Sequence, residues 1–200
     1  MIKNVVFDFG QVLVHFEPLY MTQKYIPNES DAKLAADIIF DRLYWDKLDE
    51  GTISDDEVIA AIAERLPTHL SESGIKAYKN WIYNIPEIEG MRALIEKIKK
   101  EKGVHVFVLS NISRYFAEHA HEISILKEAE KCIFSSVCGY IKPHADIFDH
   151  LCKECGIQPS ETLFIDDNQK NIDGARAFGI HAYQFDGDVQ ALSNYLTETL

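Results

Sequence analysis

The sequence predicts an α/β fold, in which helices doubly wind a five-stranded parallel, Rossmann-like sheet that carries an inserted α-helical unit. Five short apolar segments recur along the chain, separated by stretches whose apolar residues repeat at helical spacing. Between residues 16 and 86, by contrast, helix follows helix without a strand. We therefore expect a core formed by residues 1–15 and 87–200, and a helical insert formed by residues 16–86.

The expected strands are short runs rich in valine, isoleucine and aromatic residues, as in sheets buried on both faces. They cover residues 2–8, 104–110, 132–137, 162–166 and 180–185.

The expected core helices show apolar stripes that end at a glycine, a residue that commonly follows the last helical turn. The three stripes end at Gly103, Gly156 and Gly179. In the insert the pattern predicts helices over residues 18–25, 30–43, 54–66 and 72–83, and the segment SDDE predicts a capping box at the third of these.

Composition and charge narrow the possible partners. A chain of 200 residues with 46% apolar content can bury one sizeable core and a small accessory unit. Its net charge of −12 opposes binding to nucleic acids and anionic membranes. No signal sequence or membrane-length apolar run is present, so we expect a cytoplasmic protein, whose four cysteines are better explained as reduced thiols than as a zinc or disulfide set.

Polar residues follow four of the apolar segments and predict a single site. Asp8 closes the first, Ser110 and Asn111 follow the second, Lys142 comes after the third, and the pair Asp166 and Asp167 follows the fourth. Because the carboxyl ends of parallel strands meet at one edge of the sheet, these groups should lie together. Two adjacent carboxylates without an obvious basic neighbour repel each other, and a hard cation would remove that repulsion.

The same four segments resemble the motifs of the haloacid dehalogenase superfamily of aspartyl-phosphate phosphatases. The matching segments are FDFGQVLV, LSN, IKPHADIF and FIDDNQKNIDGA. They occur in the family's order and the resemblance covers nearly the whole chain. The first motif is most similar to that of bacterial phosphatases with a helical cap, some of which act on sugar 1-phosphates such as α-D-glucose 1-phosphate.

This resemblance implies a role for each polar residue. Asp8 would attack phosphorus and form an aspartyl-phosphate, and Lys142 would balance the charge of Asp8 and the phosphate. Ser110, Asn111 and Lys142 would bind the phosphoryl group. Mg²⁺ would be held by Asp8, by the Gly10 carbonyl, and by Asp166, Asp167 or both. Asn171 would orient Asp167 or Lys142. The implied partner is a small phosphorylated metabolite.

Gly10 is the main departure from the family pattern, since most members carry there an aspartate that protonates the leaving group. General acid catalysis contributes about 10²–10⁴ in rate, so its loss must be tolerated or supplied elsewhere. A good leaving group reduces the need, which favours a sugar 1-phosphate or an aryl phosphate as substrate. Replacement acids lack strong support in the sequence, and the cap acids are more simply helix-surface charges. The possible replacements are His15, Asp46, Asp49 and Glu50.

Two alternatives remain. A 2-haloacid dehalogenase also begins with attack by an aspartate and lacks the second one, but expelling a halide needs no metal, so the pair Asp166 and Asp167 favours phosphate chemistry. A catalytically idle binding protein with this fold is the other alternative, because a motif residue is missing at Gly10.

Overall fold

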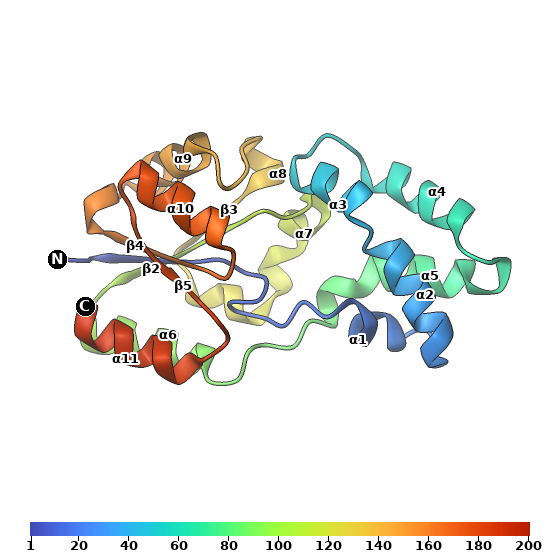
Figure 1. Ribbon diagram of the computed structural model, residues 1–200, viewed down its shortest axis with the longest axis horizontal. Helices are drawn as coiled ribbons and strands as arrows, with labels where there is room; N and C mark the ends of the chain where they lie inside the picture. Colours follow the sequence, from blue (N-terminus) through green and yellow to red (C-terminus); the bar gives the residue numbers. More distant parts are fainter.

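The computed structural model describes residues 1–200 and contains one parallel sheet with the strand order β3-β2-β1-β4-β5 (Figure 1). Each pair of neighbouring strands is parallel. This confirms the predicted fold class. The strands are β1 (Asn4–Phe7), β2 (His105–Ser110), β3 (Lys131–Phe134), β4 (Thr162–Asp166) and β5 (His181–Gln184).

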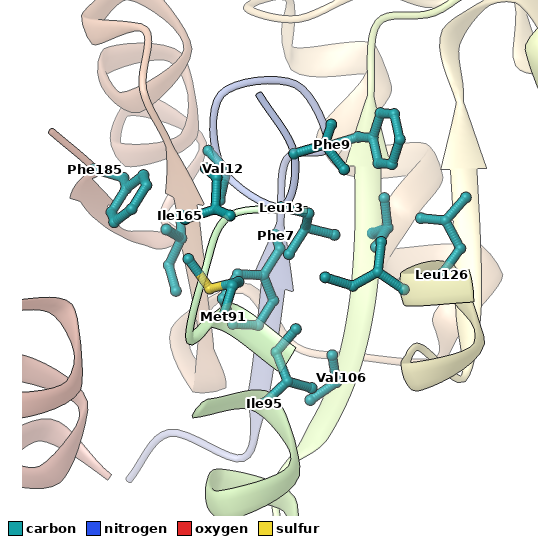
Figure 2. Close-up of a cluster of buried hydrophobic side chains, with 14 of the residues drawn as sticks. Phe7, Phe9, Val12, Leu13, Met91, Ile95, Val106, Leu126, Ile165 and Phe185 are labelled. Carbon is teal, nitrogen blue, oxygen red and sulfur yellow. The ribbon is translucent and has the colours of Figure 1, made fainter. Parts of the chain in front are cut away.

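Helices cover both faces of the sheet (Figure 1). Successive β1 residues point to opposite faces. Val5 and Phe7 belong to the apolar cluster that includes α6 (Met91–Lys102) and α11 (Val189–Thr199), and Figure 2 shows Phe7 beside Met91 of α6. Val6 packs with α9 (Ala145–Cys155) and α10 (Gln169–Phe178) on the other face. This double burial explains why the strand sequences are apolar throughout.

The predicted helix ends in the core are correct. α6, α9 and α10 are followed by Gly103, Gly156 and Gly179, which have left-handed φ angles of 64°, 66° and 98°. A helix at α11 was not predicted, nor were α7 (Arg114–His119) and the short 3₁₀ turns η2 (Ala120–Glu122), η3 (Ser124–Glu128) and η4 (Pro159–Glu161).

The chain between β1 and α6 is entirely helical apart from its connections. It forms a small apolar core of its own, which includes Ile39, Leu48 and Ile62. The expected capping box is present between Ser54 and Glu57. The elements are α1 (Pro18–Gln23), α2 (Glu29–Ile39), α3 (Arg42–Asp49), α4 (Asp55–Arg65), α5 (Thr68–Asn80) and η1 (Trp81–Tyr83).

Three sequence-based boundaries were wrong. The helix predicted over 72–83 begins earlier, at Thr68, and consists of α5 and η1. The helix predicted over 30–43 ends at Ile39, because the Asp41 carboxylate accepts a hydrogen bond from the backbone N–H of Leu43 and begins α3. The strand predicted over 132–137 ends at Phe134, and the chain turns into α8 (Ser135–Cys138). The Ser135 hydroxyl there accepts a hydrogen bond from the Ile112 N–H.

The helical segment is joined to the core by two connections that run side by side. The N–H of His15 donates to the Pro86 carbonyl at 2.8 Å, and the N–H of Ile88 donates to the Leu13 carbonyl at 3.0 Å. This places the segment beyond the carboxyl ends of the strands (Figure 1). None of the helices has the length and apolar content needed to cross a membrane. All four cysteines are free.

Candidate functional site

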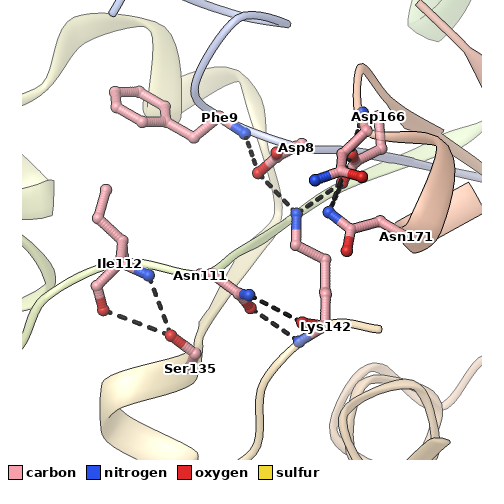
Figure 3. A network of polar contacts seen from close by, with 9 residues as sticks. Asp8, Phe9, Asn111, Ile112, Ser135, Lys142, Asp166 and Asn171 are labelled. Carbon is pink, nitrogen blue, oxygen red and sulfur yellow. Dashed lines mark hydrogen bonds and ion pairs between the residues drawn. The ribbon is translucent and has the colours of Figure 1, made fainter. Parts of the chain in front are cut away.

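The polar groups predicted from the sequence meet at the carboxyl edge of the sheet (Figure 3). Asp8 follows β1, Ser110 ends β2 and Asp166 ends β4. Because β1 pairs with both β2 and β4, these three residues are neighbours in space. Lys142 reaches them from the loop between α8 and α9.

Lys142 lies between two carboxylates. Its ammonium is 2.9 Å from Oδ1 of Asp8 and 2.7 Å from Oδ2 of Asp166, and the lysine side chain is 1% exposed. Burial alone would lower the pKa of Lys142, but the charges of Asp166 and Asp8 raise it above the ordinary value. The lysine therefore stays charged.

Asp166 has all of its acceptor positions occupied. Oδ1 accepts hydrogen bonds from the N–H of Asn168 and from the Asn171 amide, and Oδ2 accepts from Lys142 and from the same amide. A carboxylate offers about four lone pairs in all. Asn171 thus orients Asp166, and not Asp167 or Lys142 as the sequence suggested.

Asn111 fixes the loop that carries Lys142. Its side-chain oxygen accepts from the Lys142 N–H at 2.8 Å, and its amide donates to the Lys142 carbonyl at 3.0 Å (Figure 3). Asn111 therefore holds the lysine backbone in place while also lining the site. The sequence suggested that Asn111 contacts phosphate, and it did not reveal the two hydrogen bonds from Asn111 to the Lys142 backbone.

The three carboxylates of the site form a compact acidic cluster. Asp8, Asp166 and Asp167 each offer an oxygen, and these oxygens lie within 4.8 Å of one another. Burial raises the pKa of Asp8 to about 7, with Asp166 adding to the rise and Lys142 opposing it. Burial and the Asp166 charge also raise the pKa of Asp167, the least buried of the three. One ammonium does not balance three carboxylates, so the cluster can accept a further cation.

The loop after β1 turns back on itself at the cavity. The N–H groups of Leu13 and Val14 both donate to the Phe9 carbonyl, and Gln11 adopts a left-handed φ of 58°. A Cβ added to Gly10 would have no atom within 4 Å, so sterics alone do not exclude a side chain there.

A cavity of about 220 Å³ reaches Asp8, one member of the acidic cluster, and is shared by the core and the helical segment. The core contributes Asp8, Phe9, Gly10, Gln11, Ser110, Asn111 and Ile112, and the helical segment and its connections contribute Phe16, Phe40, Arg42, Trp45, Asp46, Asp49 and Trp81.

Four aromatic side chains form one wall of this cavity. Phe16 contacts Phe40, Trp45 and Trp81 with ring centroids 5.5–5.6 Å apart, and the two tryptophan rings are 5.1 Å apart. Trp81 is 2% exposed, and the Trp45 indole donates to the Ile39 carbonyl. The wall is well packed, so it provides a firm apolar surface.

The sequence missed the helix that supplies much of this lining. Arg42 and Phe40 were not singled out, yet both line the cavity. Asp41, an N-cap residue type directly before RLYW, is the signal that would have revealed α3. Two of the suggested replacement acids, His15 and Glu50, are exposed and lie outside the lining.

Known proteins resemble this chain in sequence and in fold. The haloacid dehalogenase-like hydrolase family matches residues 2–179. The chain is 30% identical over 192 residues to the D-ribitol-5-phosphate phosphatase of Bacteroides thetaiotaomicron, with 92% of each chain covered.

Two solved structures share the fold over nearly their full length. One, described as a predicted HAD-like family hydrolase from Porphyromonas gingivalis, has a TM-score of 0.72 and 25% identity, and 98% of each chain is covered. The other, a HAD family enzyme from Bacteroides thetaiotaomicron in complex with magnesium and inorganic phosphate, has a TM-score of 0.71 and 20% identity, with 96% of this chain and 99% of that chain covered.

Proposed function

The chain belongs to the haloacid dehalogenase-like hydrolase family, and on this premise we propose that it is a magnesium-dependent hydrolase of small sugar or polyol phosphates that works through an aspartyl-phosphate on Asp8. The chain is a phosphatase of this family. The remaining elements of the proposal are the nucleophile, the ion, the proposed cap and the substrate class.

The position of the two Asp8 oxygens carries the proposal. Oδ1 accepts hydrogen bonds from the Phe9 N–H and from Lys142, whereas Oδ2 accepts none and belongs to a residue that lines the cavity. A carboxylate held by one oxygen keeps the other free to attack phosphorus, which splits hydrolysis into two easier steps. We assign to the Lys142 ammonium, which contacts the same carboxylate, a second contact with the phosphoryl oxygens. Ser110 and Asn111 also line the cavity.

The donor set fits Mg²⁺. Asp8 and Asp167 have oxygens without hydrogen-bond donors, and all ligands in the cluster are oxygens, which this ion prefers. We assign the direct ligands to Asp8, the Gly10 carbonyl and Asp167, with the saturated Asp166 orienting Lys142. Bound Mg²⁺ would offset the negative charge of the phosphoryl oxygens during transfer.

Residues 16–86 are proposed to act as a cap that selects the substrate. Half of the residues that line the cavity belong to this segment. Its aromatic wall lines the same cavity as the polar core residues Asp8, Ser110 and Asn111. A pocket of this kind suits a short polyol or sugar whose carbon chain lies against the rings. The related enzyme acts on D-ribitol 5-phosphate, a phosphorylated polyol, and Gly10 favours a sugar 1-phosphate for its better leaving group.

A panel of phosphorylated sugars and polyols, including D-ribitol 5-phosphate and a hexose 1-phosphate, tests the proposal by phosphate release with Mg²⁺ and with EDTA. We expect release with Mg²⁺ only, and none from Asp8→Asn. Turnover of 2-haloacids without phosphate release would instead support the dehalogenase alternative. A folded protein that turns over neither the phosphate esters nor 2-haloacids would support the alternative of a catalytically idle binding protein.

The assignment of the metal ligands has its own test. Asp167→Asn should raise the Mg²⁺ concentration needed for half-maximal activity by at least tenfold and leave the melting temperature nearly unchanged. Asp166→Asn should lower the melting temperature, because an amide nitrogen would face the donors of Lys142 and Asn171. The reverse pattern would assign the ion to Asp166.

A further inference from the structure

The phosphatase chemistry proposed above needs a proton donor that the core does not supply at Gly10. The helical segment offers three nearby acids, all on or next to α3. Glu50 is exposed and outside the cavity. Asp46 lines the cavity but is 55% exposed, and its carboxylate already pairs with Arg42 at 2.9 Å. Asp49 lines the cavity, is partly buried and has no side-chain partner.

We propose that Asp49 is the general acid and base of this phosphatase, and that the helical segment carries this group to the core nucleophile across the cavity. This inference depends on the proposed function. The general acid would then lie on the helical segment, whereas in most of the superfamily it lies at the position that Gly10 occupies here.

A direct contact between α3 and the core fixes the position of Asp49. The Ser135 hydroxyl at the start of α8 donates to the Asp49 carbonyl at 2.5 Å, and the same oxygen accepts from the Ile112 N–H (Figure 3). Ile112 itself lines the cavity, two residues after Ser110. The Asp49 backbone is therefore tied to the end of β2, beside the site of phosphoryl transfer.

The surroundings of Asp49 favour a carboxyl that can hold a proton. Burial raises the pKa of Asp49 to about 7, with Asp46 and Asp8 adding to the rise, and Arg42 and Lys142 opposing it. Asp49 is also the last residue of α3, where the negative end of the helix dipole disfavours a further negative charge. A group with a pKa near the working pH can both donate and accept a proton.

The proton balance closes over the two steps. As Oδ2 of Asp8 bonds to phosphorus, the bond from phosphorus to the ester oxygen breaks, and protonated Asp49 gives its proton to that oxygen. The products are the free alcohol, the aspartyl-phosphate and the Asp49 carboxylate. The carboxylate then takes a proton from water as the water oxygen attacks phosphorus. The bond from phosphorus to Oδ2 of Asp8 breaks, with its electron pair returning to the carboxylate. Inorganic phosphate leaves, and the Asp8 carboxylate and protonated Asp49 are restored.

The test compares leaving groups in the wild type and in Asp49→Asn. The substrates are the alkyl phosphate of the panel that the wild type cleaves fastest, and p-nitrophenyl phosphate, whose leaving group departs without a proton. For the alkyl ester we expect kcat/KM to fall by about 10²–10⁴. With p-nitrophenyl phosphate we expect a stoichiometric burst of nitrophenol at near wild-type rate, followed by slow turnover because the second step has lost its base.

The burst also shows that the variant is folded and that its nucleophile works. Glu50 is a neighbouring exposed acid outside the cavity, so Glu50→Gln is the matched control and should keep wild-type rates. The high-pH decline of kcat/KM for the alkyl ester should be present in the wild type and absent in Asp49→Asn. A partial recovery of alkyl ester cleavage is expected when Gly10→Asp is added to Asp49→Asn.

Two results would overturn the inference. They are an equal loss of burst rate and alkyl ester turnover in Asp49→Asn, and no loss of either. Each leaves the proposed function standing, since that fails only if the wild type releases no phosphate from any sugar or polyol phosphate or if Asp8→Asn stays active.

Discussion

Asp8 occupies a position that lowers the stability of the folded protein when its carboxyl is charged. Its folded-state pKa is about 7 against 3.8 when unperturbed, chiefly because it is buried. A raised carboxyl pKa contributes stability below the unfolded value, and that contribution is lost as the pH rises through the folded value. In the absence of metal, the free energy of unfolding should therefore fall between pH 4 and pH 7 on account of this residue.

Asp8→Asn should consequently raise stability while abolishing activity. The amide oxygen can still accept the bond from the Phe9 N–H, and one buried negative charge is removed. At pH 8 in EDTA we expect a melting temperature higher by a few degrees, since about 1 kcal/mol corresponds to about 2–4 °C at this chain length. The gain should disappear at pH 5, where Asp8 already holds a proton. A lower melting temperature at pH 8 would contradict this account of the site.

At the scale of single elements, Gly174 in α10 allows the helix to lie against the loop that carries Lys142. A Cβ on Gly174 would overlap the Pro143 carbonyl oxygen and lie 2.8 Å from the Pro143 Cβ. Gly174→Ala must push the loop away, and Lys142, the residue before Pro143, would move with it. Overpacking of this kind costs about 1–3 kcal/mol.

We therefore expect Gly174→Ala to lower both the melting temperature and kcat, even though residue 174 is outside the cavity lining. Gly10→Ala is the matched control for stability, because its Cβ would meet nothing within 4 Å. Equal melting temperatures for the two variants would show that α10 and the loop can separate without consequence.

The elements that the sequence predicted well are those with a strong local pattern. β1, β2 and β4 are continuous apolar runs, and α6, α9 and α10 have apolar stripes closed by glycine. α3 was missed because α2 and α3 are separated by only Phe40 and Asp41, so their apolar positions merge into one stripe. The break depends on one cap hydrogen bond from Leu43 to Asp41.

The same distinction explains what could be predicted of the site. Asp8, Ser110, Lys142 and Asp166 come directly after strands or in a recognisable motif, and the structure brings them together. Asp49 differs, because the contact that places it joins residues 86 positions apart in the chain. No local pattern encodes such a contact, so the sequence could name Asp49 only as one of four possible replacement acids.

At the scale of the whole molecule, the cavity exists because the helical segment and the core meet at several places around it. These are the connections at His15 and Pro86, the stacked rings of Trp81 and Phe116, the hydrogen bond from Tyr115 to the Lys79 carbonyl, and the contact between α3 and α8. The contact between α3 and α8 is small. It consists of the Ser135 hydrogen bond and of Gly51, whose added Cβ would lie 3.0 Å from the Ser136 carbonyl oxygen. A contact of this size can form and break during turnover.

Ser135 and Ser136 offer a matched pair for testing whether this contact controls closure. Ser135→Ala removes the bond to the Asp49 carbonyl and leaves the Ile112 N–H without an acceptor. A hydrogen bond has a net value of about 0.5–1.5 kcal/mol, so the closed form should become roughly 2–12 times less favoured. The Ser136 hydroxyl is buried without any hydrogen-bond partner, so Ser136→Ala should be neutral or slightly stabilising. We expect faster amide hydrogen exchange in α3 and a lower kcat/KM for Ser135→Ala alone. If both variants behave alike, the cavity is held closed by the other contacts between the helical segment and the core, and Asp49 remains in place without the contact between α3 and α8.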